Sequence, residues 1–336
     1  MRKQLRTLLP LLVLFSNMAV KTRAEEPFVA PGQITNAALV YWQAFAFLPD
    51  LDEDETKLLQ QAENDAEQLD KAKPLLSRTG TAINITQHVQ PEVPCRWEMI
   101  EDGPGTLLPH LGKARLLARL IVLQAKLDVQ AGEDAAAADH LASALLVARN
   151  VDGGVLVQML VGDAIESKVI EATEDVMPEL DEASLQRLSR SLAKLPARPS
   201  LGDAIRYERD IFAEWMRPVM TADADQAREK LKQLGMSESA EMDAILAGSK
   251  KERSERFDEF VVEYGKLIEA GELPLPAAKK EFQRLEAALE KSSNPLVRML
   301  MPAAGRAFER HTEVDRQFAM LQDALRDALM VEDSNQ

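Results

Sequence analysis

The feature that most constrains the fold is the stretch 107–176, where apolar residues follow the spacing of three consecutive amphipathic helices. From Leu107 to Ala125 they recur at intervals of three and four positions, which places them on one helix face. Glycine-containing breaks at 131–134 and 150–154 separate the helices, and Asp134 is expected to cap the second one. Because a short connection brings consecutive helices side by side, the stretch predicts antiparallel helical hairpins.

The first of these hairpins resembles one degenerate tetratricopeptide (TPR) unit. The hairpin has a small residue, a turn residue, a small, a large and a small residue at the relative spacing of that repeat. They are, in this order, Ala125, Gly132, Ala137, Leu141 and Ala144. Its aromatic positions are filled by Ile121 and Asp128 instead, and no second copy follows at the period of about 34 residues. The resemblance therefore predicts a helical hairpin rather than a repeat array.

The rest of the chain also has helical periodicity, interrupted by prolines and capping residues. Further helices are expected at 35–47, 50–69, 181–195, 201–217, 250–270, 276–291 and 295–331, with short charged helices between 221 and 248. Asp181 and Ser200 are expected to cap two of them. Pro302 is expected to kink the last one, because proline lacks the N–H that a helix interior uses.

The segment 78–106 is the longest one without helical periodicity, and it contains three glycines and three prolines. Within it, 82–89 has the composition of a short extended piece. A loop of this length in a compact domain is usually functional, or it packs as a strap over the core. We expect such a strap here, meeting the helix that begins near Leu107.

Alanine and leucine dominate the composition, and aromatic residues make up only 5% of the chain, which favours helices over sheets. We expect an all-α fold: an irregular array of antiparallel helical hairpins, TPR-like or α-solenoid-like, with one long irregular strap. An N-terminal hairpin region at 25–199 and a C-terminal helical region at 200–336 are expected to pack as one continuous unit.

Residues 1–24 have the layout of a signal peptide: basic residues at the start, a mostly apolar run at 8–20, and small residues before Glu25. The run contains a proline and is shorter than the about 20 apolar residues that span a bilayer. Two basic residues near the cleavage point leave open an uncleaved leader that acts as an anchor. The sequence predicts export to the periplasm or cell envelope.

The cysteine content and the net charge exclude several classes of protein. Cys95 is the single cysteine, so no internal disulfide forms, and its position excludes a lipoprotein anchor. The net charge of −15 becomes −20 once the five positive charges of residues 1–24 are removed. Nucleic acids and anionic membranes bind positive surfaces, so neither is an expected partner. The simplest reason for the excess of negative charge is that it keeps the protein soluble.

The densest group of reactive residue types comprises Cys95, Trp97, Glu98, Glu101, Asp102 and His110. A cysteine nucleophile needs a base and an orienting partner close to it, which His110 and an acidic residue would supply if the strap folds back. A lone buried cysteine is the alternative. As binding residues of a groove at the strap, we predict Trp97, His110 and Arg115.

Other candidate chemistry is weaker. The four histidines are scattered at His88, His110, His140 and His311, and none belongs to a known metal-binding spacing, so neither a metal site nor a cofactor is expected. Asp163 and Glu166 interrupt an apolar helix, and they are expected to form an interhelical pair with arginine or a salt-bridged surface.

Several segments together resemble an uncharacterised family of exported bacterial α-helical proteins. They are residues 36–49, 95–97 with 101–104, 107–119, 196–215 and 294–302. Members commonly read Cys-Asp-Trp-Gly where this chain has Cys95-Arg96-Trp97-Glu98. The resemblance implies a helical fold and export, and it implies no activity, catalytic residue or cofactor.

The leading functional hypothesis is therefore an exported, non-catalytic interaction or scaffold protein. It would bind a protein or peptide partner in a groove where the strap meets the helix near Leu107. The alternative is a hydrolase-like enzyme with a site around Cys95, Glu101, Asp102 and His110. A third hypothesis is a structural envelope component anchored by its leader.

Overall fold

The computed structural model describes residues 34–233, 240–301 and 304–333. From Thr35 onward the described residues belong to one compact unit. Their regular secondary structure is helical, and the one β-bridge among them joins Asp102 and Pro104 in the strap. The predicted all-α class is therefore confirmed. The predicted signal peptide at 1–24 lies outside the described residues.

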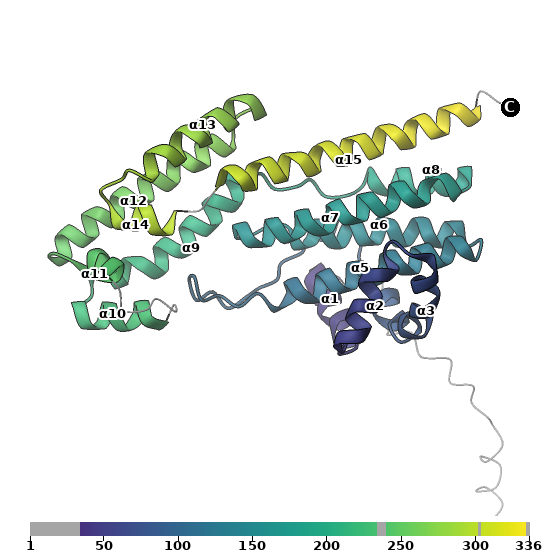
Figure 1. Ribbon diagram of the computed structural model, residues 1–336, viewed down its shortest axis with the longest axis horizontal. Helices are drawn as coiled ribbons and strands as arrows, with labels where there is room; N and C mark the ends of the chain where they lie inside the picture. Colours follow the sequence, from purple (N-terminus) through teal and green to yellow (C-terminus); the bar gives the residue numbers. More distant parts are fainter. Residues whose placement is uncertain (1–33, 234–239, 302–303, 334–336) are drawn as a thin grey trace, which may run out of the picture. The chain divides into compact units, whose positions relative to one another are not determined.

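The helices follow one another along the chain as shown in Figure 1. Their bounds are α1 Ala37–Ala46, α2 Glu53–Ala62, α3 Ala66–Ser77, α4 Gly80–Thr86, α5 Pro109–Gln130, α6 Asp134–Val151, α7 Leu156–Val176, the 3₁₀ turn η1 Met177–Glu179, α8 Glu182–Leu192, α9 Leu201–Thr221, α10 Ala224–Gln233, α11 Ala240–Leu246, α12 Lys250–Gly271, α13 Leu275–Leu289, α14 Pro295–Leu300 and α15 Ala304–Asp333. Asp181 caps α8 and Ser200 caps α9, as predicted.

The three central helices lie where the periodicity predicts them. Consecutive members pack against each other, α5 on α6 and α6 on α7 (Figure 1). Gly132 takes a φ of +73° just after α5, the left-handed conformation that ends helices. The predicted capping role of Asp134 is wrong: its carboxylate instead accepts a hydrogen bond from the backbone N–H of Asp181 at 3.0 Å, because the start of α8 lies beside the start of α6.

Two expectations for the N-terminal region are corrected. The segment 82–89 is not extended: residues 80–86 form α4, whose side chains Ala82, Ile83 and Ile85 are buried, and α4 packs on α1. The two isoleucines favour a strand by propensity, and burial against α1 overrides that preference. The helix expected at 50–69 is two helices, because Asp65 caps a second one.

The C-terminal helices enclose an apolar core that also includes the start of α7. Met159 of α7 belongs to the same cluster of buried side chains as Phe257 and Phe260 of α12. The long helix α15 then runs back along α7 and α8 (Figure 1). The packing therefore includes contacts between helices far apart in the chain, in addition to the nearest-neighbour contacts that build a solenoid.

The helix expected at 295–331 is two helices, because Met301, the C-cap of α14, has an extended backbone that ends the helix before α15 begins at Ala304. Pro302 itself lies outside the described residues. Among the helices that the structure describes, none combines the length and the apolar character needed to cross a bilayer.

Candidate functional site

A groove of about 500 Å³ lies between the strap (here residues 87–108), the connection from α6 to α7, and one side of α9. We call it the strap groove. Its lining includes Cys95, Trp97 and Glu101 of the strap, and Tyr207 and Ile211 of α9. The groove follows the strap as far as Leu108, the residue before α5, but its opposite wall is formed by α9, whereas the sequence analysis places a binding site between the strap and α5.

The beginning of the strap is held by the first residues of the described chain. Asn36 pairs with the backbone of Arg96 in both directions, donating to its carbonyl at 2.8 Å and accepting from its N–H at 2.9 Å. Ala37 also donates its N–H to the carbonyl of Pro94 at 2.9 Å. Asn36 is the N-cap of α1, so the strap and α1 are fixed to each other at this point.

Trp97 anchors the strap in the core. Its ring stacks on His110 with 4.4 Å between centroids and on Phe45 with 5.9 Å. Its Nε1 donates to the carbonyl of Asn150 at 2.8 Å. Only 8% of the residue remains exposed. Trp97 lines the groove with one edge, and most of its surface serves packing.

The buried environment opposes nucleophilic chemistry at Cys95. Burial raises the pKa of Cys95 to about 12, whereas a reactive thiol has a lowered pKa. His110 is fully buried, and burial lowers its pKa to about 4. Its Nε2 accepts from Gln158 at 3.1 Å, and its Nδ1 has no hydrogen-bond partner in the described chain. No hydrogen bond therefore links this ring to the thiol.

Glu101 and Asp102, which belong to the predicted catalytic group, make hydrogen bonds that stabilise the strap. Glu101 accepts a hydrogen bond from the Tyr207 hydroxyl at 2.8 Å, which ties the strap to α9 across the groove. Burial, and then this carboxylate, raises the pKa of Tyr207 to about 12. Asp102 is exposed, and its backbone N–H bonds the hydroxyl of Thr106. Glu101 and Asp102 thus make hydrogen bonds that shape the strap.

Glu98 lines the groove in a strained backbone conformation. Its φ of +48° lies in the left-handed region, which glycine adopts at lower cost than other residues. The conformation fits a position where glycine is preferred, and it turns the chain between the buried Trp97 and the exposed Ile100.

The far end of the strap rests on α9 through a glycine. Gly103 has a φ of +52°, and a Cβ atom added to it would lie 2.3 Å from Cγ of Trp215. Two physical reasons therefore require glycine here, the left-handed backbone and the close approach to the indole. Sequence reasoning noted the glycine and missed its partner, which lies more than a hundred positions away.

Replacing Gly103 by alanine is expected to displace the end of the strap from α9. Backbone strain and the steric clash together should lower the free energy of unfolding by about 2–4 kcal/mol. Gly132→Ala is a matched control: Gly132 has a φ of +73° and no atom within 4 Å of its Cβ position, so it should show strain alone, about 1 kcal/mol. Chemical denaturation of both variants measures the difference. Equal losses would show that the contact with Trp215 contributes nothing.

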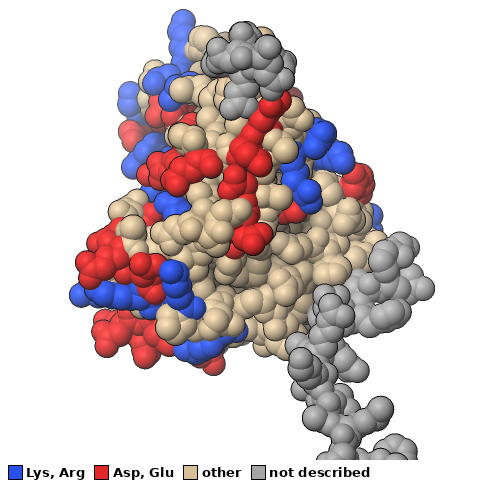
Figure 2. All heavy atoms as spheres, turned by 90° about the vertical axis from the view of Figure 1, so that its right-hand side faces the viewer, with Lys and Arg blue, Asp and Glu red and all other residues tan. Residues whose placement is uncertain are grey.

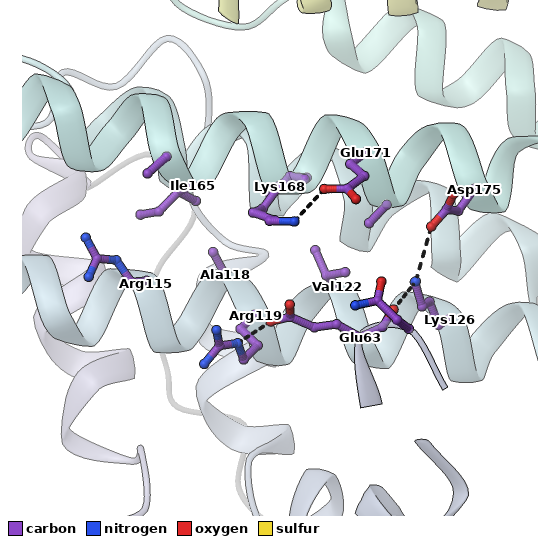
Figure 3. Close-up of a pocket in the computed structure, with 14 residues that line it drawn as sticks. Glu63, Arg115, Ala118, Arg119, Val122, Lys126, Ile165, Lys168, Glu171 and Asp175 are labelled. Carbon is purple, nitrogen blue, oxygen red and sulfur yellow. Dashed lines mark hydrogen bonds and ion pairs between the residues drawn. The ribbon is translucent and has the colours of Figure 1, made fainter. Parts of the chain in front are cut away.

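Arg115, the third predicted binding residue, lies outside the strap groove. It lines a smaller pocket of about 280 Å³ between α5 and α7, with an apolar floor that includes Ala118 and Val122 (Figure 3). Other basic side chains at this pocket pair with carboxylates of the same rim. The pairs are Arg119 with Glu63, Lys168 with Glu171 at 2.6 Å, and Lys126 with Asp175 at 3.6 Å. The rim therefore neutralises most of its own charge.

On the face drawn in Figure 2, acidic side chains form a band with basic side chains on either side.

A cluster of buried charges lies where α6, α7, the connection before α9 and α15 meet. It comprises Arg149, Asp152, Asp163, Glu166, Arg198 and His311, and we call it the charged cluster. The expected interhelical pair of arginine and glutamate is present, since Arg149 of α6 contacts Glu166 of α7 at 2.7 Å. Arg198 adds contacts to Asp163 and, at 3.3 Å, to Glu166.

Burial is the largest effect on two carboxylates of the charged cluster. It raises the pKa of Asp152 to about 7, although Arg198 acts in the opposite direction, and it raises the pKa of Glu166, although Arg149 and Arg198 act in the opposite direction. The pKa of Arg198 is raised as well: burial alone would lower it, and the surrounding carboxylates outweigh burial. The sequence marked Asp163 and Glu166, which interrupt an apolar helix, and it contained no sign that they meet Arg198 and His311.

Comparisons of the chain with family models, with curated proteins and with solved structures found no match.

Proposed function

We propose that this protein is an exported, non-catalytic interaction protein of the periplasm or cell envelope, and that its strap groove binds an extended segment of a partner protein. The observation that carries the proposal is the exposure of two large apolar side chains on the strap: Ile100 is 90% exposed and Leu107 is 79% exposed. Each is the chain neighbour of residues that line the groove. Apolar side chains exposed beside a groove are typical of interaction sites.

The charges around the groove favour a basic partner segment. Acidic residues outnumber basic ones in the lining of the groove. The charged residues there are Arg96, Glu98, Glu101 and Asp203. Complementary charge steers a partner and selects against competitors. We therefore expect the bound segment to combine apolar side chains with lysine or arginine.

The surrounding architecture supports this proposal. Trp97, Asn36 and Gly103 hold the strap at several points, so a partner would meet a preorganised surface, which lowers the entropic cost of binding. The groove ends at Leu108, the residue that precedes the α5–α6 hairpin, and that hairpin resembles a TPR unit. Hairpins of that class present partner peptides on a helical framework. Export rests on the leader pattern at 1–24.

Selection from a random library of 12-residue peptides tests the proposal on the purified protein. We expect the enriched peptides to pair apolar residues with lysine or arginine. Covering one of the two strap side chains contributes about 1.5–2 kcal/mol, so Ile100→Asp and Leu107→Asp should each weaken a selected peptide at least about tenfold, measured by fluorescence anisotropy.

Val262→Asp provides the matched control. Val262 is 60% exposed on α12 and does not line the groove, so this variant should bind the peptide as the unmodified protein does. The proposal is wrong if Val262→Asp weakens binding as much as the strap variants, or if the enriched peptides are acidic.

A further inference from the structure

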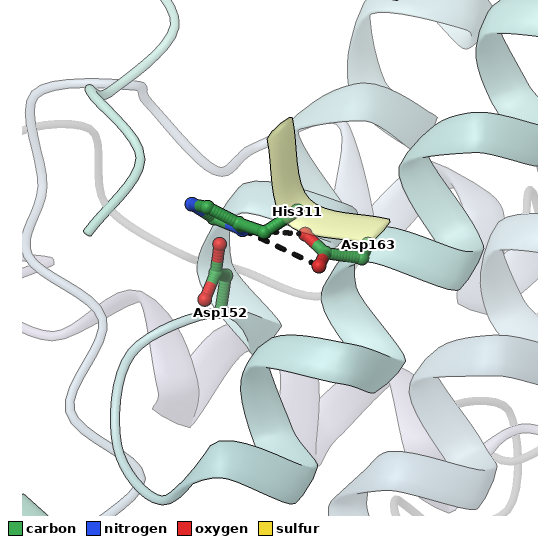
Figure 4. Close-up of side chains that lie close together, drawn as sticks. All are labelled: Asp152, Asp163 and His311. Carbon is green, nitrogen blue, oxygen red and sulfur yellow. Dashed lines mark hydrogen bonds and ion pairs between the residues drawn. The ribbon is translucent and has the colours of Figure 1, made fainter. Parts of the chain in front are cut away.

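Asp152, Asp163 and His311 come from three separate elements and meet inside the molecule. Asp152 is the C-cap of α6, Asp163 lies on α7, and His311 lies on α15. One potential donor atom from each lies within 4.8 Å of the others. Both carboxylates turn toward the imidazole in Figure 4, and Oδ1 of Asp163 is 3.0 Å from Nδ1 of His311.

The Asp152 carboxylate lacks the partners that a buried charge requires. Its side chain is 2% exposed, and neither oxygen has a hydrogen-bond partner in the described chain. The guanidinium Nε of Arg198 is 3.7 Å away, within ion-pair range, and it also makes no hydrogen bond. A buried carboxylate without hydrogen bonds is costly, so this position favours a ligand that brings positive charge.

The side chains within and around the cluster also include more acidic groups than guanidiniums. Four carboxylates belong to this network: Asp152, Asp163, Glu166 and Asp315. Two guanidiniums, those of Arg149 and Arg198, oppose them. Carboxylates therefore outnumber guanidiniums in this network, which favours a ligand that brings positive charge.

We infer that a divalent transition-metal ion, with Zn²⁺ as the best match, binds between Asp152, Asp163 and His311. Two carboxylate oxygens and one imidazole nitrogen form a mixed oxygen and nitrogen donor set, which suits Zn²⁺ or Mn²⁺. Ca²⁺ and Mg²⁺ prefer oxygen donors alone. The bound ion would join the end of α6, the middle of α7 and α15. The sequence spacing gave no sign of this site, because its donors lie at positions 152, 163 and 311.

Arg198 competes with the ion for the same donors. Its Nη2 contacts Asp163 and lies 2.6 Å from Nδ1 of His311. Its Nη1 pairs with Asp315 at 2.6 Å and reaches the backbone carbonyl of His311 at 3.1 Å. Metal binding would require Nη2 to leave these donors, which makes Arg198 the competitor of the ion. Removing this competitor, as in Arg198→Gln, should tighten metal binding.

Titration of the chelator-treated protein with Zn²⁺, followed by isothermal calorimetry, tests the inference. We expect one saturable site, with affinity reduced at least about tenfold in Asp152→Asn and in His311→Gln. Asp315→Asn, which removes a charge from the same network without removing a donor, should retain the site. At a free Zn²⁺ concentration about a hundred times the dissociation constant, the unfolding temperature should rise by about 5 °C.

His88→Ala controls for adventitious binding, because His88 is a partly exposed histidine outside the charged cluster. Circular dichroism establishes that each variant is folded, and the near-isosteric Asp152→Asn and His311→Gln remove donors from different helices, so one of them remains informative if the other unfolds. The inference is overturned if Zn²⁺ does not saturate one site, if both donor variants bind as the unmodified protein does, or if His88→Ala alone abolishes binding.

Discussion

Replacing Glu166 by leucine is expected to lower the free energy of unfolding by about 3–5 kcal/mol. Glu166 is 1% exposed, and its Oε1 accepts a hydrogen bond from Nε of Arg149 at 2.9 Å. Without it, the Arg149 guanidinium stays buried beside the carbonyl of Pro196 and the ring of Phe318, neither of which carries a neutralising charge. Urea denaturation, with a metal chelator present, measures the loss.

The double variant Arg149→Met with Glu166→Leu shows whether the loss comes from an uncompensated charge. Replacing both charges by apolar side chains of similar volume removes the desolvation cost together with the attraction. We therefore expect the double variant to recover most of the stability that Glu166→Leu loses. Additive losses would contradict this explanation and would point to packing at both positions instead.

Replacing Trp97 by alanine is expected to cost about 3–5 kcal/mol and to release the strap. The change removes a ring that stacks on His110 and Phe45, and it removes the hydrogen bond to Asn150. Trp97→Phe keeps a ring and loses the N–H, so it should cost only about 1–2 kcal/mol beyond a small packing change.

Two measurements test the expected effects of Trp97→Ala. Denaturation gives the loss of stability, and hydrogen exchange reports the strap, whose amides from 95 to 106 should lose protection more than those of α12. A loss below about 1 kcal/mol, or unchanged exchange in the strap, would show that Trp97 does not anchor it.

How well the sequence predicts each part of this fold depends on how local the determining interactions are. The helices α5 to α7 follow from apolar periodicity over long segments, and the caps at Asp181 and Ser200 follow from contacts within one turn. The helix α4 was missed because Ile83 and Ile85 have strand propensity, and a tertiary contact with α1 decides their conformation.

The strap groove was predictable only in part. The missing periodicity of the strap marked its position, whereas Tyr207 and Trp215 lie on a helix with a different place in the sequence. The sequence did not identify Arg198 as a buried residue. It lies between two prolines in the connection before α9, where no apolar periodicity indicates burial, yet its side chain is only 5% exposed. Contacts between distant segments create both the groove and the charged cluster.

Three of the five segments that carry the predicted family resemblance meet at the strap. Asn36 binds the backbone of Arg96, and Gly103 packs on Trp215, so residues from 36–49, 95–97 with 101–104, and 196–215 lie close together. Membership of that family remains a prediction.

The most direct test of the central claim, that a partner binds in the strap groove, is site-specific photo-crosslinking in cells that produce the protein. A photoreactive residue at position 107 is expected to capture a defined partner, and an excess of the selected peptide should reduce this capture. The same residue at position 262 should not capture the partner. Capture that is equal at both positions, or that the peptide does not reduce, would contradict the account.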